Sequence, residues 1–138
     1  MFSNSTDIQR GAANLLQNAA KLAPGERLLI VHESSDLAYY DAGMISALSK
    51  AGREMGAHVS LHEVGFEPTV TMLPQDLREA TAAADKVVFV ARVGDQLRFV
   101  DLGMRTQAVV CYALDRRMLG SRFATADHRP FVELKAAV

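Results

Sequence analysis

Five side chains that could bind a ligand lie in two short segments, each of which follows an apolar run. Ser34, Ser35 and Asp36 follow the run RLLIVHE, and Arg92 and Asp95 follow the run KVVFVA. Open parallel sheets bind ligands beyond the carboxyl ends of their strands, and hydroxyl and N–H groups at a helix start can hold an anion. Simple capping of the next helix is the commoner role of a Ser-Ser-Asp segment. We therefore predict a ligand site at these five residues, with capping as the alternative for the first three.

The histidines and the cysteine do not predict a reactive or metal-binding centre. His58 and His62 are four residues apart on a predicted strand, which places them on one face but roughly 13 Å apart. One zinc ion cannot bind both side chains at that separation. Cys111 lies within an apolar run, where a cysteine behaves as a small hydrophobic residue rather than as a nucleophile. We therefore predict no catalytic residue and no metal ligand in these residues.

Nucleotide-dependent classes and a phosphorylation switch lack their motifs. No G-x-G-x-x-G follows the first apolar run, and the chain has no P-loop, so dinucleotide and nucleoside triphosphate sites are not predicted. A receiver-type switch would need a phosphoacceptor aspartate at the end of the third strand, where Arg92 stands. A receiver-like switch is therefore the weakest of the alternatives.

Composition and net charge exclude some classes of binding partner. The 138 residues include 15 basic and 16 acidic side chains, for a net charge of −1, whereas nucleic-acid-binding proteins usually carry a basic excess. No apolar run approaches the roughly 18 residues that span a bilayer, and the first residues do not resemble a secretory signal. We expect a cytoplasmic protein with no nucleic-acid or membrane partner. The basic segment 115–129 could contact an acidic partner or serve as a solvated linker.

Apolar runs and turn residues predict the elements that position these side chains. Four predicted strands, of which the second has the less regular pattern of a sheet edge, alternate with helices, which is typical of a parallel sheet with helices on both faces. We predict one three-layer α/β domain over residues 1–138, with a mostly parallel sheet of about four strands in the order 2-1-3-4 or, alternatively, 3-2-1-4. The strands are predicted at 27–33, 58–64, 86–92 and 106–114, and the helices at 6–22, 37–55, 74–84, 95–102 and 130–138.

The last predicted helix bears on the length of the protein. The segment PFVELKAAV would stop after roughly two turns without a cap or stop signal. We therefore expect the chain to be the N-terminal part of a longer protein.

The order of these elements resembles a known family. The stretch LAPGERLLIVHESSDLAYYDAGMISALSKAGREMGAHVSLHEV resembles the opening of the M29-type leucyl aminopeptidases, the aminopeptidase T group, and of their dihydroxypyridine-dioxygenase-like relatives. The Gly56-Ala57 pair and the segment ATAAADKVVFV match that pattern, and DRRMLGSRFATADHRPFVELKAAV resembles the connection to the second half of the family. The resemblance covers nearly the whole chain, through motifs that describe the fold more than the chemistry.

The resemblance implies a Rossmann-like N-terminal domain that shapes or covers the active site of a metal-dependent, aminopeptidase-like hydrolase, often in a dimer. In that family the metal ligands, which are carboxylates and histidines with a tyrosine, come from the C-terminal half. We therefore expect no cofactor within these residues, and a divalent metal in a C-terminal catalytic domain of the same chain. The segment RVGDQLRFV lacks the Thr/Ser-rich turn expected after the third strand, which argues against peptidase activity. A free-standing small-molecule or protein-interaction module is the alternative.

Overall fold

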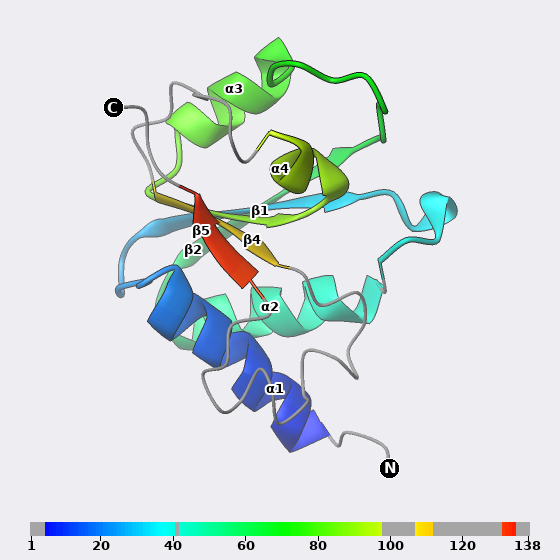
Figure 1. Cartoon of the computed structure of the whole chain (residues 1–138). Coiled ribbons are helices and arrows are strands. Elements are labelled where there is room, and N and C mark those ends of the chain that lie inside the picture. Colours follow the sequence, from blue (N-terminus) through cyan, green and yellow to red (C-terminus); the bar gives the residue numbers. More distant parts are fainter. Residues whose placement is uncertain (1–4, 41, 98–106, 112–130, 135–138) are drawn as a thin grey trace.

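Helices cover both faces of a central sheet in the computed structural model, which describes residues 5–40, 42–97, 107–111 and 131–134. Helices α1 and α2 lie on one face of the sheet, and α3 and α4 lie on the other (Figure 1). The bounds are Ser5–Asn14 for α1, which continues as one π-helical turn at Leu15–Ala19, Ala42–Glu54 for α2, Gln75–Ala82 for α3 and Arg92–Gln96 for α4. No helix in the described part of the chain is long and apolar enough to span a bilayer.

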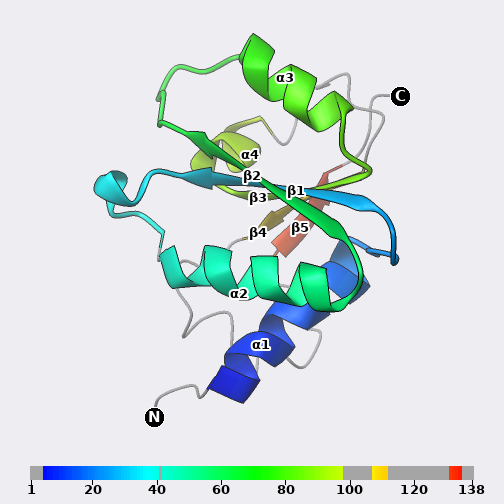
Figure 2. The same ribbon diagram turned by 180° about the vertical axis from the view of Figure 1, so that it is seen from behind.

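The sheet has five strands in the order β2-β1-β3-β4-β5. The first four are parallel, and β5 runs antiparallel to β4. Strand β2 forms the edge that faces the viewer in Figure 2. The predicted α/β class and the predicted order 2-1-3-4 are confirmed. The strands span Arg27–Glu33 (β1), His58–Val64 (β2), Lys86–Val90 (β3), Gln107–Cys111 (β4) and Phe131–Leu134 (β5).

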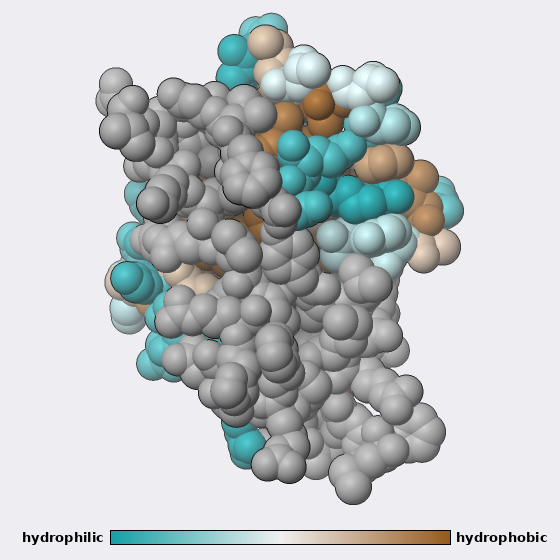
Figure 3. All heavy atoms as spheres, in the orientation of Figure 1, coloured by the Kyte–Doolittle hydropathy of each residue, from teal (hydrophilic) through white to brown (hydrophobic). Residues whose placement is uncertain are grey.

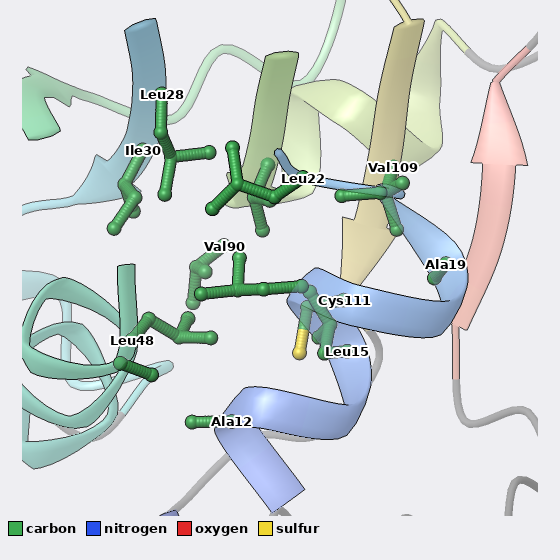
Figure 4. Close-up of a cluster of buried hydrophobic side chains, with 14 of the residues drawn as sticks. Ala12, Leu15, Ala19, Leu22, Leu28, Ile30, Leu48, Val90, Val109 and Cys111 are labelled. Carbon is green, nitrogen blue, oxygen red and sulfur yellow. The ribbon is translucent and has the colours of Figure 1, made fainter. Parts of the chain in front are cut away.

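The two faces of the central strands build two separate cores. On the α1 and α2 face, Leu28 and Ile30 of β1 pack with Leu15 and Leu48, and Figure 4 shows these side chains converging with Cys111. The core of the opposite face includes these buried residues: Val31, Leu77, Phe89, Leu97 and Val110. A large apolar side chain that is fully buried contributes about 1.5–3 kcal/mol, so the two cores hold the sheet rigid from both sides.

Two glycines set the position of α2. A Cβ atom at Gly52 would lie 2.9 Å from both Leu28 Cδ2 and Val59 Cγ2, so the helix packs closely on β1 and β2 only because this residue has no side chain. Gly56 has φ +87, a left-handed conformation that favours glycine after a helix. The helix predicted to end at residue 55 ends at Glu54, so this prediction is confirmed to within one residue.

The prediction for the last segment is wrong in part, because residues 131–134 form β5 and not a helix. The segment pairs with the free edge of β4, where Val110 is the partner of Val132 and Cys111 is the partner of Phe131. The edge of β4 supplies backbone hydrogen-bonding partners for residues 131–134, whereas a short helix would have to form its hydrogen bonds internally. The expectation that the chain continues beyond Val138 was based on the predicted helix. Because these residues form a strand, that argument no longer applies, and the expectation remains an untested prediction.

Three other helix boundaries differ from the prediction. The first helix ends before Lys21, whose φ of +55 is left-handed. Between β1 and α2 the chain makes one 3-10 turn at Ser35–Leu37, and Ala38 with φ +53 separates that turn from α2. Helix α4 begins at Arg92, earlier than predicted, and Glu33 accepts the N–H of its first residue. Residues 98–102 of that predicted helix and the basic segment 115–129 lie outside the described residues.

Candidate functional site

The place where an open α/β sheet usually binds a ligand lies between β1 and β3. The crossover from β1 to β2 passes through α2 on one face, and the connection that follows β3 begins with α4 on the other. The connections that follow β1 and β3 therefore diverge and leave a crevice at the carboxyl ends of these strands. Glu33, the last residue of β1, and Arg92, the first residue of α4, meet at this point.

Glu33 and Arg92 form a closely packed ion pair. Arg92 Nη2 donates to Glu33 Oε1 at 2.7 Å, and Arg92 Nε donates to Oε2 at 3.0 Å. The backbone N–H of Arg92 also donates to Oε2 at 2.6 Å. The Glu33 side chain is only 1% exposed, against 24% for that of Arg92. The pair therefore satisfies both carboxylate oxygens and ties β1 to the start of α4.

Two aromatic rings cover the guanidinium group of Arg92. Its Cζ lies 4.1 Å from the ring centroid of Tyr39 and 3.7 Å from that of Phe66. Tyr39 belongs to the connection between β1 and α2, and Phe66 to the connection between β2 and α3. Cation–π attraction of about 0.5–2 kcal/mol per ring is expected for such contacts. Arg92 thus joins three connections at the carboxyl edge of the sheet.

Exposed apolar side chains lie on the two connections whose rings contact Arg92. Leu37 and Tyr39 are each 42% exposed and Phe66 is 38% exposed; we call these three residues the apolar rim. Figure 3 shows apolar residues at the right-hand edge of the view, where the connection between β1 and α2 lies in Figure 1. The carboxyl edge therefore combines a satisfied ion pair with an apolar surface.

The predicted ligand-binding residues have different surroundings. Arg92 is held by Glu33, as described above. Ser34 belongs to a local turn, because its Oγ accepts the N–H of Asp36 at 3.3 Å, and Ser35 begins the 3-10 turn that follows. Asp95 is an exposed residue in the first turn of α4. Ligand binding by these residues remains a prediction.

The alternative role for the Ser-Ser-Asp segment, capping of the following helix, is wrong for α2. That helix begins at Ala42, beyond Ala38 with its left-handed φ. The Ser34 hydroxyl and carbonyl instead accept N–H groups of the 3-10 turn, from Asp36 and from Leu37. The segment therefore stabilises its own turn.

Glu33, Tyr39 and Phe66 were not among the five ligand-binding residues predicted from the sequence, although Glu33 and Phe66 stand at the carboxyl ends of predicted strands, where ligands bind. One signal was present for Glu33, because a carboxylate at the end of an apolar run is rarely buried without a partner. His32 pairs with Val90 in the register of β1 and β3, which places Glu33 beside the residue that precedes Arg92. The two aromatic residues lie in loops, where no periodic pattern marks them.

Two cavities flank the ion pair. The first has a volume of about 220 Å³ and is largely apolar, with Val64, Phe66, Leu77 and Val93 among its lining residues. The second has a volume of about 200 Å³ and includes these polar lining residues: His32, Glu33, Tyr40, Ser46 and Glu63. Both are smaller than the roughly 300–1,000 Å³ of sites for drug-sized ligands. Only a small molecule could therefore be enclosed at this edge.

Tyr40, which lines the second cavity, is a neutral hydrogen-bonding group. Burial raises the pKa of Tyr40 above its ordinary value, and the negative charge of Glu33 raises the pKa further. The phenol therefore keeps its proton at neutral pH. Tyr40 can donate a hydrogen bond but does not supply a phenolate nucleophile or base.

The described residues offer no obvious metal centre. Among them, no three His, Cys, Asp or Glu side chains come together in a group that could hold a metal ion. His62 contacts Asp76, with 3.4 Å between Nε2 and Oδ2, and Cys111 is fully buried in the apolar core.

Comparisons with known proteins reveal likeness of fold. No family model matches the chain, and no curated protein sequence matches it. The fold is similar to that of a fatty acid ABC transporter substrate-binding protein from Thermomonospora curvata, with a TM-score of 0.53 and 14% identity over 91% of this chain. A 2,5-dihydroxypyridine dioxygenase from Pseudomonas putida KT2440 matches 70% of this chain, with a TM-score of 0.49 and 16% identity. This chain spans 32% of the length of each.

Proposed function

We propose that this chain is the N-terminal α/β domain of an M29-like metal-dependent enzyme, in which it shapes or covers an active site whose metal ligands lie elsewhere. The observation that carries this proposal is the apolar rim around a satisfied ion pair. Such an edge is suited to packing against another protein surface. The partner we propose is a C-terminal catalytic domain of the same chain, and a homodimer contact is the other arrangement expected from the family resemblance.

The electrostatics of the carboxyl edge support a role without catalysis. Glu33 uses both carboxylate oxygens on Arg92, so it is not placed to act as a general base. Arg92 is neutralised by Glu33 and covered by two rings, so only part of its surface could polarise a substrate. The same contacts hold Tyr39 and Phe66 in place, which lowers the entropic cost of docking on them.

The lengths of similar proteins are compatible with this role. The chain covers 32% of the substrate-binding protein whose fold it shares. A sheet of this kind thus occurs as one part of a longer polypeptide, and its carboxyl edge is then available to a neighbouring domain. This likeness concerns the fold and says nothing about the substrate.

The first test is the intact mass of the native polypeptide, together with its metal dependence. We expect a mass well above the 15.0 kDa of these residues. We also expect the native polypeptide to bind a divalent metal stoichiometrically, which residues 1–138 alone would not do. A native mass of 15.0 kDa, or stoichiometric metal binding by residues 1–138, would overturn the proposal.

The role of the apolar rim can be tested within the longer polypeptide. Leu37→Asp places a charge on the rim, and we expect it to weaken the contact with the catalytic domain and lower kcat/KM. Leu61→Asp is a matched control, because Leu61 is 49% exposed but lies in the middle of β2. Equal effects of the two substitutions on kcat/KM would contradict docking through the rim.

A free-standing binding module is the second candidate function. The two cavities beside the ion pair favour it, since they offer partly open sites of about 220 and 200 Å³. A native mass of 15.0 kDa would make this module the better proposal. It would also direct the search for ligands to these cavities.

A further inference from the structure

The smaller cavity lies between the carboxyl ends of β1 and β2 and the first turns of α2. His32 of β1 and Glu63 of β2 are register partners, so their side chains project side by side on the α2 face of the sheet. Tyr40, Ile45 and Ser46 also line this cavity, which has a volume of about 200 Å³. Three separate segments thus bring polar side chains to one small space.

Three of the polar side chains that line this cavity have no hydrogen-bond partner in the described part of the chain. The carboxylate of Glu63 and the hydroxyls of Tyr40 and Ser46 make no hydrogen bond or ion pair with any residue in the described part of the chain. By contrast, the carboxylates of Glu33 and Asp85 are each paired with an arginine. The cavity therefore holds hydrogen-bonding capacity that the fold itself does not use.

The charged side chains that line the cavity determine the charge of the ligand that it favours. Glu33 also lines the cavity, but Arg92 neutralises its carboxylate. Glu63 is the carboxylate without an arginine or lysine partner among the described residues, so it favours a cation. The ring of Tyr40 and the side chain of Ile45 offer apolar contact to a short carbon chain, and the ring also attracts a cation.

We propose that this cavity binds a small molecule that carries a protonated amine beside a hydroxyl or carbonyl group. The ammonium group donates to Glu63, and the hydroxyls of Tyr40 and Ser46 contact the neighbouring oxygen. A volume of about 200 Å³ restricts the ligand to a few heavy atoms, as in a short amino alcohol. Ligand binding at this cavity requires neither a catalytic domain nor a free-standing chain. This proposal therefore goes beyond both functions proposed above.

The probe for this site is 2-aminoethanol, titrated into the uniformly ¹⁵N-labelled chain and followed by amide chemical shifts. We expect saturable shifts at His32, Tyr40, Ser46 and Glu63. Ethylene glycol is the matched neutral probe of the same size and should produce no saturable shift. Absence of saturation by 2-aminoethanol at millimolar concentration, or equal binding of ethylene glycol, would overturn the proposal.

A pair of variants separates the carboxylate from general surface charge. Glu63→Gln should raise the Kd for 2-aminoethanol about tenfold, because the acceptor of the ammonium hydrogen bond loses its negative charge. Glu54→Gln, at the far end of α2, should leave the Kd unchanged; both side chains are exposed, so neither change should unfold the chain. Equal affinities of wild type and Glu63→Gln would refute the site and leave the result of the mass measurement unaffected.

Discussion

Replacing Arg92 by methionine tests whether the ion pair with Glu33 holds the carboxyl edge of the sheet together. The change removes the hydrogen bonds from Nη2 and Nε and leaves a carboxylate that is 1% exposed without its countercharge. Removing one partner of a buried ion pair costs about 3–5 kcal/mol. The backbone N–H of residue 92 still donates to Glu33, so we expect the lower end, about 3 kcal/mol.

The assay is urea unfolding followed by far-ultraviolet circular dichroism. A loss of about 3 kcal/mol lowers the midpoint by about 1–2 M urea if the slope is unchanged, and lowers the Tm by about 10 °C. Arg27→Met is the matched control, because Arg27 forms an ion pair with Asp85 at the opposite end of β1 with both side chains well exposed. Exposed pairs contribute little, so this control should remain close to wild type.

A second substitution distinguishes the loss of a charge partner from the loss of packing. Adding Glu33→Gln to Arg92→Met removes the uncompensated charge and keeps an acceptor for the N–H of residue 92. We expect the double variant to recover about 1–2 kcal/mol relative to Arg92→Met. A double variant less stable than Arg92→Met, or an Arg92→Met variant as stable as Arg27→Met, would refute the reasoning.

Three further predictions concern close packing, backbone strain and pH. Gly94→Ala should destabilise the chain by about 1–3 kcal/mol in thermal unfolding, because the new Cβ would lie 2.6 Å from Phe89 Cβ; an unchanged Tm would contradict this contact. Gly56→Ala should cost about 1 kcal/mol in urea unfolding, because φ is +87 there, and no loss would mean that the turn adapts. The side-chain hydrogen bond from Arg27 lowers the pKa of Asp85, so Asp85 contributes stability above its ordinary pKa of about 3.9 that is lost as the pH falls through the lowered value. Asp85→Asn should therefore lose less stability than wild type between pH 5 and pH 2, and parallel acid profiles would exclude this linkage.

The sequence by itself determined the position of the first strands along the chain, whereas it left two strand orders open. Strands β1 and β2 span 27–33 and 58–64, as predicted. Strand β1 is a short apolar run between turn residues, as is typical of a strand buried in a parallel sheet, and β2 is the more polar edge strand. Gly56 marked the end of α2 for a reason that is equally local, the left-handed backbone after a helix. These features depend on interactions between residues that are close along the chain, so they can be inferred without a three-dimensional structure.

Only the tertiary structure decided the rest. Segment 131–134 is a strand because the edge of β4 offers it partners, and its own sequence was equally compatible with a helix. Glu33 and Arg92 are 59 positions apart, and the unpartnered groups around Glu63 come together from three segments. Pairing across such separations depends on which strands become neighbours and on which face each side chain projects, so the local pattern at Arg92 predicted a ligand-binding cation and could not predict that Glu33 already holds it.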